Sequence, residues 1–329
     1  MQLNKSEKKV LKIGNIDVKS NVMLAPMAGI TDVVLRQLIR KYSSKCLLTT
    51  EMISSEALMQ KRGGEILEYR ENEYPLSFQL SGHKPQMMAK AAKMLSDRAS
   101  IIDINMGCPV NKVVKGGDGS ALMLTPHIAV DIVKAVKDVV DCPVTVKFRL
   151  GYTAENKNYV EFAQLMQEAG ADAMTIHCRT RSQMYSGKAD WEAIKGIKNY
   201  ISVPIYANGD VIDIESAKNC LSQSKVDGVA IARGILGNPD LIHRIEHYFE
   251  TGEILPELSI KERICLLKEH LDNEIALRGE DCGIKFTRKF YPYYIRGVRG
   301  ASQIRYSLVT EDNYDKIILL LDTLIEEND

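Results

Sequence analysis

The sequence contains few of the features that mark exported or membrane-bound proteins. No run of about 18 apolar residues is present, so no segment has the length that a membrane-spanning helix needs. The first residues, MQLNKSEKKVLKIGN, have no apolar core of signal-peptide length. The formal net charge is zero, so the chain as a whole is not a basic coat for nucleic acid. A local basic patch is still compatible with a net charge of zero, because the electrostatic attraction of a charged partner depends on how charge is distributed over the surface.

Cysteine is scattered along the chain. The seven cysteines include no C-x-x-C pair and are odd in number. We therefore expect neither a disulfide framework nor a zinc site, and a reducing cytoplasm is the expected compartment. The apolar content of 45% suits a globular protein with a substantial core, and 329 residues suit one large domain or two. We expect no bound metal, no membrane attachment and a monomer.

Eight short apolar runs rich in β-branched residues recur between residues 22 and 232. They are continuous rather than alternating, as expected of parallel strands whose outer face is covered. The predicted strands are Val22–Ala25, Cys46–Thr50, Leu76–Leu80, Ile101–Asn105, Val144–Phe148, Ala173–His177, Val203–Ala207 and Gly228–Ala232.

Helical patterns separate these strands. Residues 127–140, HIAVDIVKAVKDVV, place apolar side chains at helical spacing, with charged side chains on the other face. Residues 158–171 do the same and end near Gly170, a residue type that commonly ends helices. Eight strand–helix units of similar size predict a (β/α)8 barrel over residues 1–245. A doubly wound parallel sheet is the structural alternative.

The last part of the chain has a different pattern. From about Ile260 the sequence predicts helices only, so we expect a small helical domain over residues 258–329. The segment HYFETGEILPELS, with Gly252 and Pro256, is the predicted linker. Six basic residues in this domain have no Asp or Glu between them and alternate with aromatic residues, a pattern that suits RNA binding. The alternative is a solvated helix face with the aromatic side chains in the core. The six are Lys285, Arg288, Lys289, Arg296, Arg299 and Arg305.

The loops after barrel strands normally carry the functional groups. The first predicted strand is followed by PMAGITD, residues 26–32, which is either a plain turn or a backbone cradle for a flat ring system. Gln79 ends the third strand. Its carboxamide both donates and accepts hydrogen bonds, so it either reads the edge of a heterocycle or serves a structural role.

The fourth strand leads into DINMGCPVNKVVKGGDG, residues 103–119. Asn105 and Cys108 are expected to face the barrel mouth. Most free cysteines are simply small buried hydrophobes, but Gly107 and Pro109 fix an unusual backbone around this one. A thiol near its reference pKa of about 8.5 is mostly protonated at neutral pH and can donate a proton. The later glycines of the segment predict a loop that bends beside RNA.

Cationic side chains follow the fifth and sixth strands. Lys147 lies inside a strand of valines, and a buried ammonium needs an anionic or electron-rich partner. The alternative is a solvated lysine on an edge strand. Arg149 follows Lys147 on the same face by the period of two. His177 ends the sixth strand, with Arg179 in the next loop, and the pair suits binding of a phosphate or a reduced ring.

Glycine-containing loops follow the last two strands, where many barrels bind phosphate through backbone N–H groups. Asn208 and Gly209 fit that role after strand seven, as do Ala232 and Arg233 after strand eight. Asp210 is expected to cap the following helix. No metal-ligand cluster is evident, so an organic cofactor with a phosphate group is expected. A cationic lysine and histidine suit flavin mononucleotide (FMN), although composition alone does not distinguish it from pyridoxal phosphate.

Seven segments then occur in a specific order between Val22 and Pro239. They are LAPMAGITD, FQLSG, DINMGCPVNKVVKGGDGSALM, VTVKFRLG, TIHCRTRSQMYSGKADW, VPIYANGDV and GVAIARGILGNP. Together, N-x-G-C-P, K-x-R-x-G and H-x-R-T-R in this order are highly specific, although each alone is weak. The chain resembles the tRNA-dihydrouridine synthases, most closely the bacterial B-type subgroup, and KFTRKFYPYYIRGVRGASQIR continues the resemblance into the tail.

The resemblance implies an FMN enzyme that reduces the C5–C6 double bond of uridine in tRNA with NADPH. It places Asn105 at the uracil and Cys108 as the proton donor. Arg179 and the six basic residues of the tail are assigned to substrate binding. The cofactor-binding positions that it implies are Pro26, Met27, Ala28, Gln79, Lys147, His177, Asn208, Gly209, Asp210, Ala232 and Arg233.

The chain departs from the family pattern at a few positions. Cys178 and Ala232 stand where the family often has glycine, and Ala232 keeps the N–H that phosphate binding needs. The tail lacks the H-x-x-W often seen in the subgroup. Three rival functions are a flavin barrel acting on a free pyrimidine, an inactive RNA-binding barrel, and a phosphate-binding barrel without flavin.

Overall fold

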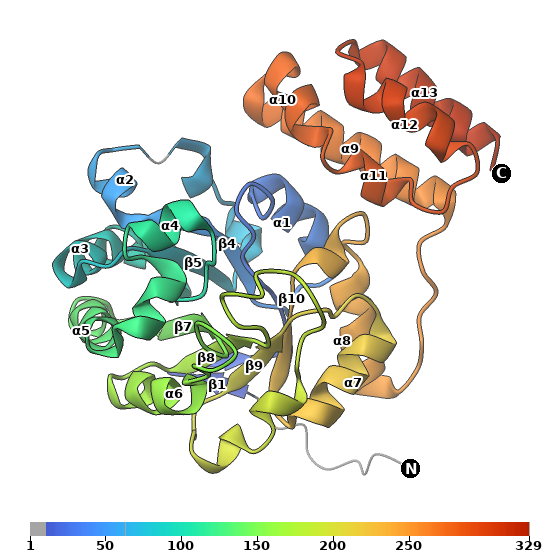
Figure 1. Cartoon of the computed structure of the whole chain (residues 1–329). Coiled ribbons are helices and arrows are strands. Elements are labelled where there is room, and N and C mark those ends of the chain that lie inside the picture. The colour runs from blue at the N-terminus through green and yellow to red at the C-terminus, as the bar shows by residue number, and fades with distance from the viewer. Residues whose placement is uncertain (1–10, 63, 329) are drawn as a thin grey trace. The chain divides into compact units, whose positions relative to one another are not determined.

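The computed structural model describes residues 11–62 and 64–328. Eight parallel strands form one sheet in the order β3-β10-β9-β8-β7-β6-β5-β4 (Figure 1). Met23 pairs with Leu47 in a parallel bridge, which joins the two end strands and closes the sheet into a barrel. The predicted (β/α)8 barrel is confirmed, and the doubly wound alternative is wrong. The strands are β3 (Val22–Leu24), β4 (Leu48–Ser54), β5 (Leu76–Ser81), β6 (Ile101–Asn105), β7 (Val144–Arg149), β8 (Ala173–His177), β9 (Ile205–Asn208) and β10 (Gly228–Ile231).

The barrel strands are buried because helices cover their outer face. Every residue of β5, β6, β8, β9 and β10 is buried, which explains their continuous apolar sequences. Figure 1 shows α3, α5 and α6 on the outside of the sheet. The outer helices are α3 (Pro85–Leu95), α5 (Pro126–Lys137), α6 (Tyr159–Glu168) and α7 (Ile214–Ser224). The short α2 (Ser55–Met59) follows β4, and the short α4 (Asn111–Lys115) lies in the loop after β6.

An N-terminal β-hairpin, which the sequence patterns did not indicate, adds to the barrel core. Strands β1 (Leu11–Ile13) and β2 (Ile16–Val18) pair antiparallel. Ile13 and Val18 are buried in one cluster with Ile101 of β6. Each strand has only three residues, too few to show a period-two pattern.

The chain divides into two compact units. The first comprises Ser44–Ala232 and the residues up to Val33, and the second comprises Val34–Ser43 and the segment from Arg233 onward. The division into a barrel domain over residues 1–245 and a helical domain over residues 258–329 remains a prediction. The helices that lie wholly or mostly in the second unit are α1 (Val33–Arg40), α8 (Leu241–Thr251), α9 (Ile260–Arg278), α10 (Glu280–Thr287), α11 (Tyr291–Tyr294), α12 (Ala301–Thr310) and α13 (Tyr314–Glu326).

Residues 252–259, between α8 and α9, contain no helix or strand, whereas residues 247–251 of the predicted linker belong to α8. The side chain of Ser259 caps α9 by accepting from Glu262 N, and Glu262 bonds back to Ser259 N. None of the helices described is long and apolar enough to cross a membrane.

Candidate active site

The carboxyl ends of the barrel strands bring the predicted side chains to one end of the first unit. Asn105 of β6 is the register partner of Lys147 on β7. His177 of β8 is the partner of both Arg149 on β7 and Asn208 on β9. Because parallel strands in register end at the same edge, these residues lie side by side at the barrel mouth.

A buried chain of side-chain hydrogen bonds links β5 to β6. Gln79 Nε2 donates to Asp103 Oδ2 at 2.6 Å, and Asn105 Nδ2 donates to Gln79 Oε1 at 2.8 Å. Thr145 Oγ1 donates to the other Asp103 oxygen at 2.6 Å. Gln79 is fully buried, and Asp103 is 6% exposed. Asp103 is not among the residues predicted from the sequence, although a carboxylate inside the apolar run SIIDIN is a usable signal.

The backbone around Cys108 is fixed by neighbouring groups. Asn105 Oδ1 accepts from Gly107 N at 3.2 Å and from Cys108 N at 2.9 Å. The Ser120 hydroxyl donates to Cys108 O at 3.0 Å, and Arg149 Nε donates to Gly107 O at 2.7 Å. Burial raises the pKa of the Cys108 thiol, so this partly buried side chain stays protonated at neutral pH.

Gly119 allows the loop to close on Cys108. Its φ is +60°, and a Cβ at this position would lie 2.8 Å from Cys108 O and 3.0 Å from Cys108 Cβ. A side chain is therefore excluded both by backbone conformation and by space. The loop also contacts the residues after β5, since His83 Nδ1 lies 2.7 Å from Asp118 Oδ1.

Lys147 carries a positive charge at the barrel mouth with a neutral partner. Its Nζ donates to Asn208 Oδ1 at 3.1 Å, and Asn208 Nδ2 donates to Ala230 O at 2.7 Å. Among the described residues no carboxylate lies within ion-pair distance of Nζ. Burial, reinforced by the nearby Arg149 charge, lowers the pKa of Lys147 to about 8.

Arg179 is bonded to the protein itself rather than exposed for a ligand. It is 1% exposed, and its Nη2 contacts both Asp210 oxygens at 2.8 and 2.6 Å. The same guanidinium donates to the carbonyls of Ser186 and Gly187. Asp210 also accepts from Ala189 N at 2.7 Å, whereas the cap of α7 is Asp213. The expected capping role of Asp210 is therefore wrong: it ties the β9 loop to the loop after β8.

The first strand-end loop is a tight turn. Met27 O accepts from Ile30 N and Thr31 N, both at 3.0 Å, and Met27 N donates to Thr31 Oγ1 at 3.1 Å. The carboxylate of Glu51 on β4 accepts from Gly29 N, a contact that the sequence patterns did not indicate. Pro26 and Met27 are half-buried, while Ala28 is exposed.

The residues expected to form the last phosphate loops occupy the ends of β9 and β10. Gly209 is buried directly after β9. Ala232 follows β10 and packs on the barrel core. Arg233 is exposed, opens a short 3-10 turn and is the first residue of the second unit's main segment.

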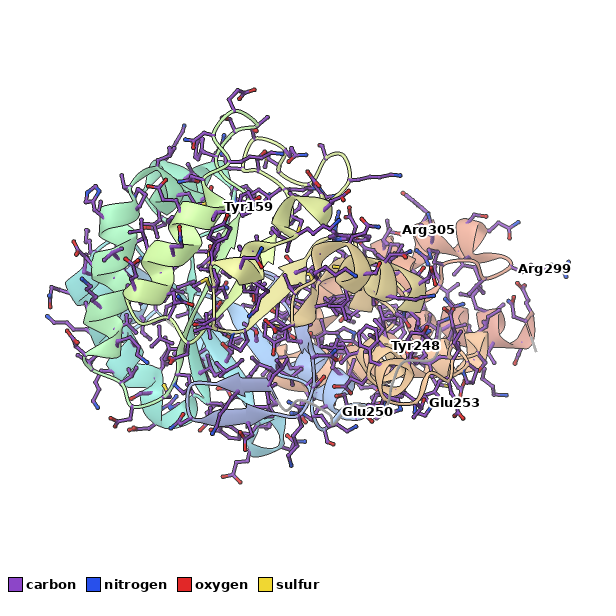
Figure 2. All side chains as sticks on the ribbon, turned by 90° about the horizontal axis from the view of Figure 1, so that it is seen from below. Tyr159, Tyr248, Glu250, Glu253, Arg299 and Arg305 are labelled. Atoms are coloured by element: carbon purple, nitrogen blue, oxygen red, sulfur yellow. The ribbon has the colours of Figure 1, made fainter. Side chains whose placement is uncertain are left out.

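The basic residues of the tail are mostly on the surface of the second unit. Arg299 and Arg305 lie among the C-terminal helices (Figure 2). Arg288 is partly buried and forms an ion pair with Asp312 at 2.7 Å. The exposed members of the set are Lys285, Lys289, Arg296, Arg299 and Arg305.

The aromatic residues of the tail are mostly in the core. Phe290, Tyr291 and Tyr294 are fully buried, whereas Tyr293 is 44% exposed. The three buried rings therefore follow the alternative interpretation, with aromatic side chains in the core, and only Tyr293 is exposed enough to contact RNA. They alternate with basic residues because the helices of this unit are amphipathic.

The donor set at the barrel mouth fits a flat, electron-rich ring. The positively charged ammonium of Lys147 donates its hydrogen bond to a neutral amide oxygen, that of Asn208. Asn105 donates one amide hydrogen to Gln79, and its second amide hydrogen is available to a ligand. Backbone turns at Met27 and Gly209 surround the same end of the barrel. Among the residues that the structure describes, no group of three or more His, Cys, Asp or Glu side chains could hold a metal ion.

Comparison with known proteins agrees with this arrangement. Residues 23–324 match the family model described as Dihydrouridine synthase. A "Probable tRNA-dihydrouridine synthase 1" from Synechocystis sp. is 40% identical over 96% of this chain and 90% of its own length. The "tRNA-dihydrouridine synthase B" of Vibrio vulnificus is 38% identical over 90% of this chain and 92% of its own length.

A solved structure shares the barrel fold. The old yellow enzyme homologue from Zymomonas mobilis superimposes with a TM-score of 0.52 and 12% identity, covering 77% of this chain and 94% of that one. The resemblance read from the motifs is thus confirmed by a family model that spans most of the chain. This protein belongs to the dihydrouridine synthase family.

Proposed function

We propose that this protein is an FMN-dependent tRNA-dihydrouridine synthase, which reduces the C5–C6 double bond of specific uridines in tRNA with NADPH as the reductant. We further propose that it acts as a monomer in the cytoplasm. Family membership supports the reaction class. The observation that carries the proposal is the joint placement of Asn105, the rigidly held Cys108 and Lys147 on neighbouring strand ends.

Several residues of the barrel mouth would hold FMN. The turn of Pro26, Met27 and Ala28 would support the ring, with Gln79, Lys147 and His177 at its polar atoms. Asn208, Gly209, Asp210, Ala232 and Arg233 would lie at the ribityl chain and the phosphate, with the Asp210 carboxylate holding Arg179 rather than the anion. Bound FMN would supply the hydride chemistry that reduction of the C5–C6 double bond requires. Lys147 places positive charge beside the ring, where preorganised charge stabilises developing negative charge most strongly.

Cys108 would donate the proton that C5 of the uracil requires. Its raised pKa keeps the Sγ–H available at neutral pH, and its backbone is held by Asn105 and Ser120. A positioned acid of this kind contributes roughly 10²–10⁴-fold to the rate. Asn105 would hydrogen-bond the edge of the base, which must leave the RNA stack to reach the barrel mouth.

The exposed basic residues of the second unit would bind the tRNA backbone. The sequence has no Asp or Glu between the first and the last of them. These exposed residues are Lys285, Lys289, Arg296, Arg299 and Arg305. Arg179 and Arg288 would not contact the tRNA directly but would hold other residues of the protein in place. Arg179 holds Asp210, and Arg288 is paired with Asp312.

The decisive test is a map of dihydrouridine in tRNA from a strain that lacks this protein, before and after the gene is restored. We expect specific positions to lose dihydrouridine and to regain it on restoration. In parallel, purified protein with FMN and NADPH should act on unmodified tRNA and not on free uridine or orotate. An unchanged modification map, or turnover of the free pyrimidine alone, would refute the proposal.

A further inference from the structure

Asp103 is a buried carboxyl group with no direct part in the proposed reaction. It lies in the middle of β6, is 6% exposed, and receives hydrogen bonds from Gln79 and Thr145. We propose that Asp103 is a positioning residue that acts through Gln79 to orient Asn105 and the Cys108 loop. The route, called the amide relay below, runs from Asp103 through Gln79 and Asn105 to the N–H groups of Gly107 and Cys108.

The chemistry at the two ends of the amide relay fixes its direction. Backbone N–H groups only donate, so the side-chain atom of Asn105 that faces Gly107 and Cys108 must be its oxygen. The Asn105 amide nitrogen therefore faces Gln79 Oε1, and the Gln79 nitrogen faces Asp103. A carboxylate accepts at this last position, so both ends demand the same arrangement. The oxygen and nitrogen of an amide are nearly equal in size, but here only one arrangement satisfies every group.

The fixed direction decides what Asn105 can recognise. Its oxygen is used by two backbone N–H groups and one of its amide hydrogens by Gln79, so a single N–H donor is left. A ligand must offer an acceptor there, and a ring carbonyl oxygen provides one whereas an exocyclic amino group does not. Uracil presents carbonyl oxygens at both C2 and C4, whereas cytosine presents an amino group at C4. The site would thus favour uracil over cytosine for a base whose C4 edge faces Asn105, a conclusion that rests on the proposed function.

Three variants separate this role from general packing. Asp103→Leu removes the acceptor while keeping a similar volume. Asp103→Asn is the conservative rescue, because its amide oxygen can accept from Gln79 while its nitrogen donates to the Thr145 hydroxyl. Thr145→Val is the matched control, since it removes a bond to Asp103 that lies outside the amide relay.

The main readout is the rate at which iodoacetamide alkylates Cys108 in the purified full-length protein without tRNA, resolved by peptide mass spectrometry. Cys282, which is exposed, serves as the internal reference. With excess FMN present, Asp103→Leu should raise the Cys108 rate roughly fivefold or more, because the loop loses a fixed acceptor. Asp103→Asn and Thr145→Val should stay close to the parent protein.

Gln79→Met provides a second break in the amide relay and should raise the same rate if Asp103→Leu does not fold. Equal alkylation rates in the parent protein and a folded relay variant would overturn the inference. So would a Thr145→Val rate as high as that of Asp103→Leu.

Turnover on tRNA then tests the consequence for the reaction. Asp103→Leu should lower kcat about 10- to 100-fold with bound flavin retained, as expected when a reacting group is misplaced, and Asp103→Asn should recover most of it. An unchanged kcat in Asp103→Leu would overturn the role in the reaction. If the parent protein itself does not reduce tRNA, the proposed function fails, while the alkylation pattern still decides whether Asp103 positions the loop.

Discussion

At the scale of single residues, burial has opposite consequences for the two reactive groups. Burial raises the pKa of the Cys108 thiol, so the thiol keeps its proton. It lowers the pKa of Lys147 to about 8, so the ammonium loses its proton more readily. The first effect suits a proton donor. The second is a cost to stability that only a ligand with negative charge at that position would offset.

Cys108→Ala should retain bound flavin and lose roughly 100-fold or more of its turnover on tRNA, because the proposed proton donor is absent. Flavin absorbance of the dialysed protein and dihydrouridine formed per enzyme are the two measurements. Turnover equal to that of the parent protein would remove Cys108 from the reaction.

Lys147→Met should weaken flavin binding and yet stabilise the flavin-free protein at pH 7. The pKa of about 8, against an ordinary value of 10.5, means that folding penalises the charged ammonium below pH 8. The penalty, about 3 kcal/mol, disappears as the pH rises from 8 towards the unfolded value. Unfolding measured against pH should therefore show a gain at pH 7 that shrinks above pH 8.

Lys137 is the matched control, because its ammonium contacts Asp172 at 2.7 Å. Lys137→Met should give no such gain at pH 7. A Lys147→Met protein that stays yellow after dialysis would count against the flavin role.

The sequence predicted which residues would lie at the strand ends, but not what each would contact. Asn105, Lys147 and His177 were placed correctly because strand ends can be read from apolar runs. The contacts of Arg179 could not be predicted, because its partners Ser186, Gly187 and Asp210 are brought together by two loops. Loop conformation depends on tertiary contacts that a single sequence does not display.

At the scale of elements, the loop after β6 depends on packing more than on flexibility. Its glycines suggest, from the sequence, a loop that bends beside RNA. In the structure, Gly119 adopts a φ of +60° and lies against Cys108, and Ser120 bonds to the Cys108 carbonyl. The loop is thus a rigid support for the thiol.

Gly119→Ala should therefore lower turnover on tRNA by about tenfold or more while bound flavin is retained. The added methyl group would push on Cys108, and a small displacement of a reacting group is costly. Gly116→Ala is the control in the same loop, because Gly116 has a φ of −76° and its Cβ would come no closer than 3.3 Å to Val113 O. Equal activities of the two variants would contradict the packing role.

The elements themselves were largely predictable. All eight barrel strands were found, and β6 and β8 agree to the residue, because continuous apolar runs are typical of covered parallel strands. The hairpin of β1 and β2 was missed because three-residue strands carry too little pattern. The sequence also did not predict that α1 belongs to the second unit. That assignment depends on contacts with residues more than 190 positions later, from Arg233 onward.

At the scale of the whole molecule, a net charge of zero conceals an uneven distribution. Five exposed basic residues lie between Lys285 and Arg305, where the sequence has no acidic residue. Nucleic-acid binding through such a segment depends on salt, because each phosphate contact releases counterions.

Replacing Lys285, Lys289, Arg296, Arg299 and Arg305 by Gln should weaken tRNA binding and flatten the dependence of log Kd on log salt. Filter binding at several salt concentrations measures both. The control carries the same charge change on the outside of the barrel, at Lys90, Lys93, Lys134, Lys195 and Lys218, all exposed. Equal salt slopes for the two variants would show that the tail does not contact phosphates.

The pairing of β3 with β10 has a consequence for how the protein is made. Val22 and Val229 are register partners at opposite ends of the barrel sequence. At about 5–20 residues per second, the ribosome completes β10 roughly 10 s or more after β3. Until then β3 and the newest strand are open edges, which can pair with other chains. A nascent chain that stalls after β9 already carries Cys108, Lys147 and His177, yet it exposes the edges that promote aggregation.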